Sequence, residues 1–327
     1  MRAFVTGAAG FVGSHLTDLL LDRGRAVFGL VLDRRDIANL DAALTGAHAS
    51  RLQLVEGDLS DEIAVAKAVQ DIRPDEVYHL AAQSSVRQSA DDPTATFRIN
   101  VLGTRALFEG VCRAACRPRI LYVGSAEAYG ESARSVVPLT ETRPLLPVTP
   151  YGSSKAAAEQ IALRYGTERG LHIVRVRPFP HTGPRHAAHF VYPDLAKQLC
   201  EIHAGRRLPR LEVGNLEVRR DLSDVRDVVA AYLVALERGE PGAVYNVCGG
   251  RVTSVREVLE ILIAMAGLDI EVVVQTDRLR PHDLQLLSGS NHLLRGATGW
   301  EPRIPLETTL QDLLYYWQAS RGLRVRG

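Results

Sequence analysis

The sequence predicts an α/β protein in which a doubly wound parallel sheet carries a smaller α+β region. Short apolar runs alternate with stretches whose leucines and alanines recur at helical spacing, and the connections between them are short. A glycine-rich turn joins the first apolar run directly to the first helical stretch. Because strands connected through helices pair in parallel, we expect the first half of the chain to form one sheet.

Each expected element follows from one of two patterns: a short apolar run predicts a strand, and apolar residues at helical spacing predict a helix. The apolar runs predict strands over residues 1–5, 26–32, 52–56, 76–82, 119–123 and 172–177. The helical spacing predicts helices over 14–23, 62–72, 94–115, and a further one that ends near residue 169. Beyond Pro178 the pattern is less regular, with a helix expected over 221–234 and a strand over 244–247 that returns to the main sheet. The predicted domains are therefore 1–178, with returning segments near 221–247, and a second domain built from 179–220 and 248–327.

Composition narrows the class of protein. The chain has 327 residues, 46% of them hydrophobic, and a net charge of +1, so it can bury a large core. Scattered arginines balanced by 38 acids argue against a nucleic-acid partner or a membrane surface. The four cysteines lack metal-ligand spacing, so no metal is expected. No signal peptide or membrane-spanning run is found, and a cytoplasmic location is expected.

The turn Gly7-Ala-Ala-Gly10-Phe-Val-Gly13 stands between the first strand and the first helix. Glycines at these positions allow a tight turn and close approach of a pyrophosphate to the helix N-terminus, as in Rossmann-type folds. The end of the second strand, Asp33-Arg34-Arg35, bears on the choice of cofactor. An acid there binds the ribose 2′-hydroxyl of NAD, whereas arginines accommodate the 2′-phosphate of NADP. The sequence offers both kinds of residue, and the alternative is that Asp33, Arg34 and Arg35 form only a solvated turn. We expect NADP(H), with NAD(H) as the second possibility.

Only three of the 39 basic residues are lysines, yet Lys155 follows Tyr151 by four positions. Residues i and i+4 share one face of a helix, so the phenol and the amine address the same ligand. A phenol with a pKa near ~10 is a sluggish acid or base at pH 7. We expect the ammonium of Lys155 to lower the pKa of Tyr151. Ser125, directly after the fifth strand, stands where parallel sheets place ligand chemistry.

With the 3-3 glycine spacing, Ser125, Tyr151 and Lys155 resemble the catalytic set of the extended short-chain dehydrogenases over nearly the whole chain. The resemblance implies that Ser125 orients a carbonyl and Tyr151 acts as acid or base. Glu127 matches both the glutamate base of sugar-nucleotide dehydratases and the Ser-x-Glu of reductases, or is only a carboxylate at a strand end. The resemblance also implies further cofactor contacts from Phe11, Val12, Asp58, Leu59, Leu80, Ala81, Ala82, Asn100 and Pro178, besides Tyr151 and Lys155.

Strings outside the catalytic centre resemble the nucleoside-diphosphate-sugar branch, and most of all its GDP-sugar reductases. By that resemblance Arg220 and Arg280 clamp a diphosphate, and Asp283 accepts hydrogen bonds from a ribose. Two departures are present. Pro180 replaces the family's asparagine, a contact that His181 is expected to supply. After Phe190-Val191 the dehydratases carry Thr-Arg-Lys, whereas this chain has Tyr192-Pro193-Asp194, and the loss of that cation favours a reductase. The implied substrate-binding residues are Ser84, Ser85, Ser125, Glu127, His181, Val191, Arg220, Arg280 and Asp283.

The resemblance implies an NAD(P)H-dependent reductase acting on the 4-keto group of GDP-4-keto-6-deoxy-D-mannose to give GDP-D-rhamnose. GDP-mannose 4,6-dehydratase is the first alternative, a nucleotide-sugar 4-epimerase the second, and an idle dinucleotide-binding protein the third. The family resemblance also implies a homodimer formed through the 94–115 helix and the helix that carries Lys155.

Overall fold

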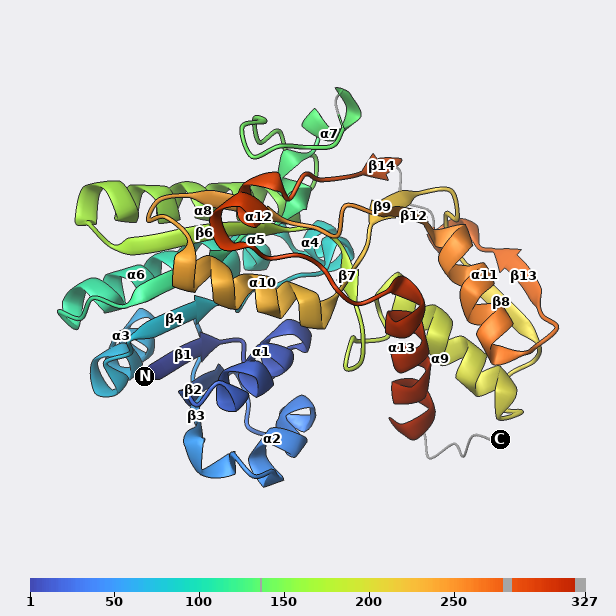
Figure 1. Cartoon of the computed structure of the whole chain (residues 1–327), viewed down its shortest axis with the longest axis horizontal. Helices are drawn as coiled ribbons and strands as arrows, with labels where there is room; N and C mark the ends of the chain where they lie inside the picture. The colour runs from blue at the N-terminus through green and yellow to red at the C-terminus, as the bar shows by residue number, and fades with distance from the viewer. Residues whose placement is uncertain (136, 279–283, 321–327) are drawn as a thin grey trace.

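The computed structural model describes residues 1–135, 137–278 and 284–320. Its main body is a seven-stranded parallel sheet in the order β11-β6-β5-β4-β1-β2-β3 (Figure 1). The strands are β1 (Arg2–Thr6), β2 (Ala26–Val31), β3 (Leu52–Glu56), β4 (Glu76–His79), β5 (Arg119–Val123), β6 (His172–Pro178) and β11 (Val244–Val247). All these pairings are parallel, so the predicted doubly wound sheet and the returning strand are confirmed.

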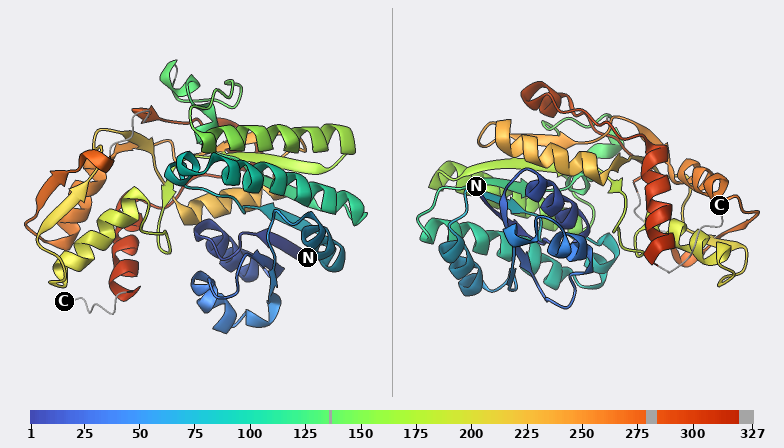
Figure 2. Two further views of the ribbon diagram at one scale, coloured as in Figure 1. Left: turned by 180° about the vertical axis from the view of Figure 1, so that it is seen from behind. Right: turned by 60° about the horizontal axis from the view of Figure 1, so that its bottom comes forward.

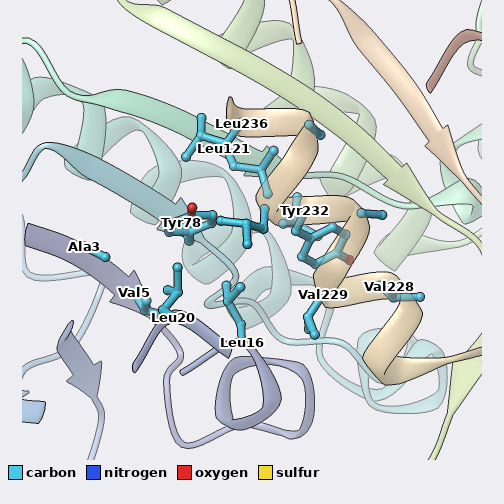
Figure 3. Close-up of a cluster of buried hydrophobic side chains, with 14 of the residues drawn as sticks. Ala3, Val5, Leu16, Leu20, Tyr78, Leu121, Val228, Val229, Tyr232 and Leu236 are labelled. Atoms are coloured by element: carbon cyan, nitrogen blue, oxygen red, sulfur yellow. The ribbon is translucent and has the colours of Figure 1, made fainter. Parts of the chain in front are cut away.

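Helices cover both faces of this sheet (Figures 1 and 2). One face carries α1 (Phe11–Asp22) and α10 (Val225–Arg238), and the other α3 (Glu62–Ile72), α6 (Gly103–Arg113) and α8 (Pro150–Arg169). Side chains alternate along β1: Ala3 and Val5 enter the first core and Phe4 the second. Figure 3 shows the first core, where Leu16 and Leu20 of α1 approach Tyr232 of α10.

The stretch predicted as one helix over 94–115 consists of three segments. The segment α5 (Pro93–Phe97) passes into a π-helical turn, η3 (Arg98–Leu102), and then into α6. The side chain of Asn100 in this turn bonds the backbone of Gln83 and the hydroxyl of Ser154. The wider turn therefore coincides with a buried polar link between three elements.

The prediction of a helix from residue 221 is wrong at its start. Two short strands, β9 (Arg219–Asp221) and β10 (Ser223–Asp224), precede α10. Asp224 caps α10 by accepting from the N–H of Arg226, 2.7 Å away. The buried carboxylate of Asp221 accepts instead from the N–H groups of Gly249 and Gly250. These long-range bonds favour extended backbone over a helix here.

The remaining elements form a smaller part beside the sheet's carboxyl edge (Figure 1). Its core joins α9 (Val191–His203), α11 (Val255–Ala266) and α13 (Leu306–Ser320) to β8 (Arg210–Val213), which pairs with β13 (Glu271–Val274). β9 pairs with β12 (Val252–Ser254) and β14 (Leu286–Leu287), and β10 pairs with β7 (His181–Thr182). α12 (His292–Thr298) lies apart from this core, since its Leu294 packs into the core of the main sheet.

Short elements complete the described chain. They are η1 (Ala38–Leu40), α2 (Asp41–Thr45), η2 (Ala49–Arg51), α4 (Val86–Asp91), η4 (Ala126–Tyr129), α7 (Ser132–Ser135) and η5 (Thr276–Arg278).

Candidate active site

Ser125, Tyr151 and Lys155 meet where β5 ends against the first turns of α8. Thr149 caps α8 by accepting from the N–H of Gly152, and Pro150 occupies the first helical position. Tyr151 and Lys155 then lie one turn apart, both buried. The side chains of Ser125 and Tyr151 hydrogen-bond each other, so the structure brings the predicted hydroxyl pair together. The Lys155 ammonium donates to the carbonyl of Val123 over 2.9 Å.

Burial dominates the electrostatics of these residues. It raises the pKa of Tyr151 to about 12, against the hydrogen bond from Ser125, while the charge of Glu127 raises it further. Burial lowers the pKa of Lys155 to about 8. The expected lowering of the Tyr151 pKa is therefore wrong for the protein on its own. The reason is that the phenolate loses its hydration in this site. At pH 7 the phenol keeps its proton and the amine is mostly charged.

Glu127 lies half-buried on the η4 turn that follows Ser125. Its N–H donates to the Ser125 hydroxyl over 3.1 Å. α8 packs tightly on this turn, since a Cβ at Gly152 would stand 2.7 Å from the Glu127 carbonyl oxygen. The predicted catalytic residues thus come from one turn and one helix held in direct contact.

The glycine turn has the form that a pyrophosphate requires. A Cβ at Gly13 would lie 2.0 Å from the carbonyl oxygen of Gly7, and one at Gly7, whose φ is +72°, would lie 3.0 Å from the backbone of Ala81. Gly10 is the N-cap of α1 and adds no side-chain cap. The first amides of α1, those of Phe11 and Val12 among them, have no intrahelical acceptors. This open cradle at the positive end of a helix fits a dinucleotide pyrophosphate.

The adenine-ribose end of the candidate cofactor site is exposed. The Arg35 guanidinium donates three hydrogen bonds to the Asp33 carboxylate, the shortest of them 2.5 Å. These bonds lower the pKa of Asp33. Arg34 donates to the carbonyl oxygen of Leu54 and lies 3.7 Å from Glu56. Asp58, also exposed, accepts from the N–H of Ser60. The Asp33 carboxylate is thus neutralised by a neighbouring cation.

The loop after β4 is held by polar groups that sequence reasoning did not single out. His79 bonds Thr6 through one ring nitrogen and Thr104 through the other, each over 2.9 Å. Burial lowers its pKa to about 3, so it is neutral. Thr6 also accepts from the N–H of Ala81. These bonds fix the loop of Leu80 and Ala82 over the glycine turn.

Three other residues expected at the cofactor lie near these elements. The side-chain oxygen of Asn100 accepts from the N–H of Gln83, and its Nδ2 donates to the Gln83 carbonyl oxygen and to the Ser154 hydroxyl. This side chain therefore anchors the loop after β4 to α8. Leu59 is buried and would meet a Cβ at Gly103, and Pro178 ends β6. Their contact with a cofactor stays a prediction.

The residues expected at the substrate are distributed over several elements. Ser84 is exposed, and Ser85 caps α4 by accepting from the N–H of Gln88. Val191, also exposed, begins α9. Arg220 of β9 donates to the carbonyl oxygen of Leu284 over 2.7 Å. Arg280 and Asp283 lie outside the described residues.

Asp194, in the first turn of α9, bears on the charge of the substrate side. Its carboxylate accepts from Arg278 over 2.7 Å and from the Gln198 amide over the same distance. Asp194 therefore neutralises an arginine that stands two residues before position 280 in the sequence.

The loop after β7 is bound along one face of α1, a feature absent from the sequence predictions. The His186 ring stacks on Phe11 with centroids 4.1 Å apart, and His181 stacks on the same ring at 5.9 Å. One turn further, His15 bonds the carbonyl oxygen of Pro184. Asp18 pairs with Arg185 over 2.7 Å. The sequence contains one indication of this contact: Phe11, His15 and Asp18 are spaced so that they lie on one face of a helix.

Among the described residues, no group of three or more His, Cys, Asp or Glu side chains is arranged to hold a metal ion. No helix in the same ranges is both long and apolar enough to cross a membrane.

Comparisons with known proteins match nearly the full chain. The family model described as GDP-mannose 4,6 dehydratase matches residues 4–313. A GDP-6-deoxy-D-mannose reductase from Pseudomonas aeruginosa is 36% identical over 320 residues, which cover 97% of each protein. A solved structure of RMD from Pseudomonas aeruginosa, complexed with NADPH, superposes with a TM-score of 0.82 at 34% identity, covering 98% of this chain and 99% of that one.

A third likeness is to an enzyme of another activity. The UDP-glucose 4-epimerase of Thermus thermophilus, solved with NAD, gives a TM-score of 0.84 at 30% identity and covers 98% of this chain and 100% of that one. The shared fold therefore carries more than one reaction, so the site has to decide between them.

Proposed function

The chain belongs to the GDP-mannose 4,6-dehydratase family of extended short-chain dehydrogenases, and from that premise we propose that it is an NADPH-dependent reductase. Its substrate is GDP-4-keto-6-deoxy-D-mannose and its product GDP-D-rhamnose. The observation that carries the proposal is the 36% identity to a GDP-6-deoxy-D-mannose reductase along 97% of both chains. The assembled Ser125, Tyr151 and Lys155 supply what a ketone reduction needs.

Each catalytic side chain has one task in this reaction. A bound reduced nicotinamide supplies the hydride that adds to C4 of the sugar. Ser125 orients the carbonyl by hydrogen-bonding its oxygen, and Tyr151 gives that oxygen a proton as hydride addition converts the C=O bond into a C–O single bond. The charged Lys155 stabilises the phenolate left on Tyr151 and would hydrogen-bond the ribose of a bound nicotinamide. Tyr151 recovers its proton from solvent, which completes the cycle.

The protonation state of Tyr151 is compatible with reduction. A proton donor must hold its proton at working pH, and burial raises the pKa of this phenol to about 12. The ion pair of Asp33 with Arg35 supports NADP(H), because a neutralised carboxylate repels a 2′-phosphate less.

A GDP-mannose 4,6-dehydratase is the second candidate, and Glu127 is the observation that favours it. Its carboxylate lies close enough to Tyr151 to raise the pKa of the phenol. A base beside the catalytic hydroxyl suits removal of the C5 proton. Against it, Asp194 is paired with Arg278 where dehydratases are expected to carry a cation.

Two substrates separate the candidates. The protein is incubated with GDP-4-keto-6-deoxy-D-mannose and NADPH, and separately with GDP-mannose alone, and the sugars are separated by anion-exchange chromatography. We expect NADPH oxidation with the keto sugar and no conversion of GDP-mannose. Conversion of GDP-mannose without added reductant contradicts the reductase and supports the dehydratase.

Oligomeric state and location are further parts of the proposal. We infer a homodimer through α6 and α8, supported by the exposed Phe97 and Leu102 on the helical stretch leading into α6.

All four cysteines are free, which supports a reducing, cytoplasmic location. We assign cofactor binding to 1–178 with segments near 221–247, and substrate binding to 179–220 and 248–327.

A further inference from the structure

A buried ionic cluster lies directly behind the catalytic residues. Glu159 follows Lys155 by one turn of α8, and its side chain is 1% exposed. Its carboxylate accepts from Nη2 of Arg177 over 2.6 Å and from Nε over 3.0 Å. Nη1 of Arg175 lies 3.3 Å away on the same face of β6. None of these three side chains has a task in the proton transfer proposed above.

The guanidinium of Arg177 also reaches the catalytic turn. Its Nη1 donates to the hydroxyl of Tyr129 over 2.9 Å and to the carbonyl oxygen of Glu141 over 3.1 Å. Tyr129 is the last residue of η4, the turn that starts after Ser125 and carries Glu127. A single side chain of β6 therefore joins the helix that carries Tyr151 to the turn that follows Ser125.

The cluster is tied to the backbone on both sides of the site. A Cβ at Gly124 would stand 3.2 Å from a carboxylate oxygen of Glu159, so this carboxylate lies against the residue before Ser125. On the other side the Tyr129 hydroxyl donates to Asn246 of β11 over 2.8 Å. The backbone N–H of Asn246 donates to the Glu141 carboxylate.

Stability alone is a weak reason for such a cluster. Removing charges from water is costly, and well-packed apolar side chains of similar volume often stabilise a core at least as well. Directional bonds, in contrast, fix one arrangement of the elements that they join. Tyr151, Lys155 and Glu159 recur every four residues, so a shift of Glu159 along or about α8 moves the two catalytic residues with it.

We propose that Glu159 and Arg177 are positioning residues that set the register of α8 against η4 and so hold Tyr151 and Lys155 in line with Ser125. This inference rests on the proposed reductase function for its kinetic test. It predicts an effect on kcat and on cofactor affinity that exceeds any effect on the KM for the sugar. The reason is that the bonds of Glu159 and Arg177 lie within α8, β6, η4 and the Glu141 backbone rather than in the smaller part beside the sheet.

The decisive comparison uses two glutamates of the same helix. Glu159→Gln is compared with Glu168→Gln, whose exposed carboxylate pairs with Arg164 over 2.8 Å near the far end of α8. We measure kcat and KM for GDP-4-keto-6-deoxy-D-mannose, and the Kd of NADPH by its fluorescence. Glu159→Gln is expected to lower kcat at least tenfold and to weaken NADPH binding about fivefold, with KM within twofold. Glu168→Gln is expected to match the wild type.

A gentler substitution covers the case in which Glu159→Gln does not fold. Arg177→Lys keeps a charge beside Glu159, but a single ammonium cannot bond Glu159, Tyr129 and the Glu141 carbonyl together. We expect a native circular dichroism spectrum, a kcat about fivefold below wild type and an unchanged KM. Folded variants at both positions with kcat and NADPH affinity within twofold of Glu168→Gln overturn the inference.

The two proposals fail separately. A wild type that does not turn over the keto sugar rejects the reductase function only. The NADPH affinities of Glu159→Gln and Glu168→Gln then decide the role of the cluster, since Lys155 is expected at the nicotinamide ribose in any reaction of this fold. Equal affinities overturn the inference.

Discussion

The two ends of the candidate cofactor site are built in opposite ways. At the catalytic end, Ser125, Tyr151 and Lys155 are all less than 10% exposed, and a buried ionic cluster lies behind them. At the adenine-ribose end, Asp33 and Arg35 form a solvent-exposed pair on a turn, with the Arg35 side chain 91% exposed. The catalytic end is therefore shielded from water, whereas the adenine-ribose end is exposed to solvent.

The difference follows from what each end has to do. Proton transfer requires atoms held within hydrogen-bond reach, and misplacement by about 1 Å can cost about 10²-fold in rate. Recognition of a 2′-phosphate requires only a cation within reach, which an exposed arginine supplies in several conformations. Substitutions at the buried end should therefore change the rate, and those at the exposed end the choice of cofactor.

The largest effect is expected from removal of the Tyr151 hydroxyl. Tyr151→Phe leaves the ring in place but removes the proton donor, so kcat should fall about 10³-fold, equivalent to about 4 kcal/mol of activation free energy. Steady-state NADPH oxidation with the keto sugar measures it. Tyr165→Phe is the matched control, since Tyr165 lies on α8 and bonds Glu109 away from the site. Near-normal turnover by Tyr151→Phe would support an idle dinucleotide-binding protein.

The pH dependence tests whether burial controls the catalytic end. Burial lowers the pKa of Lys155 to about 8, so its ammonium is present below that pH and is lost above it. The kcat/KM is therefore expected to be nearly flat between pH 6.5 and 7.5 and to fall about fivefold from pH 8 to pH 9. A profile that stays flat to pH 10 contradicts this description of Lys155.

A smaller, selective effect is expected at the exposed end. Arg35→Ala removes the cation but no buried contact, so the Kd of NADPH should rise about tenfold and that of NADH stay within twofold. The melting temperature should not change, because an exposed ion pair contributes little to stability. Fluorescence titration with each cofactor measures the two constants. Equal losses for NADPH and NADH would show that Arg35 does not read the 2′-phosphate.

The smallest effect is expected where the loop after β7 is stacked on α1. His186→Leu fills the volume of the ring but removes its stacking on Phe11, which lies beside the pyrophosphate turn. We expect the Kd of NADPH to rise about threefold, with a similar change for NADH. His189→Leu serves as a control, because His189 is exposed and contacts Phe190 rather than Phe11. No difference between the two variants would exclude a link between this loop and the cofactor.

Local patterns predicted most of the sheet, and they singled out Ser125, Tyr151 and Lys155, which the structure brings together. The strand over 52–56 and the one over 119–123 were placed at their observed bounds, because each is an apolar run ended by a turn. The glycine turn and the four-residue spacing of Tyr151 and Lys155 are equally local. Such features depend only on residues that are close in sequence.

Features set by contacts distant in sequence were missed or misjudged. Asp221 was assigned to a helix because its bonds to Gly249 and Gly250 are invisible in a local window. The pKa of Tyr151 was expected to fall, but its burial depends on the packing of α8 against η4. Glu159 and Arg177 meet only once α8 lies on β6, so neither was singled out.

Transfer of deuterium tests the central claim most directly. The protein is supplied with GDP-4-keto-6-deoxy-D-mannose and NADPH deuterated at the transferable position of the nicotinamide, and the product is analysed by NMR and mass spectrometry. We expect one deuterium at C4 of GDP-rhamnose for each NADPH oxidised. A product without deuterium at C4, or formation of a keto sugar from GDP-mannose with no net NADPH consumption, would contradict it.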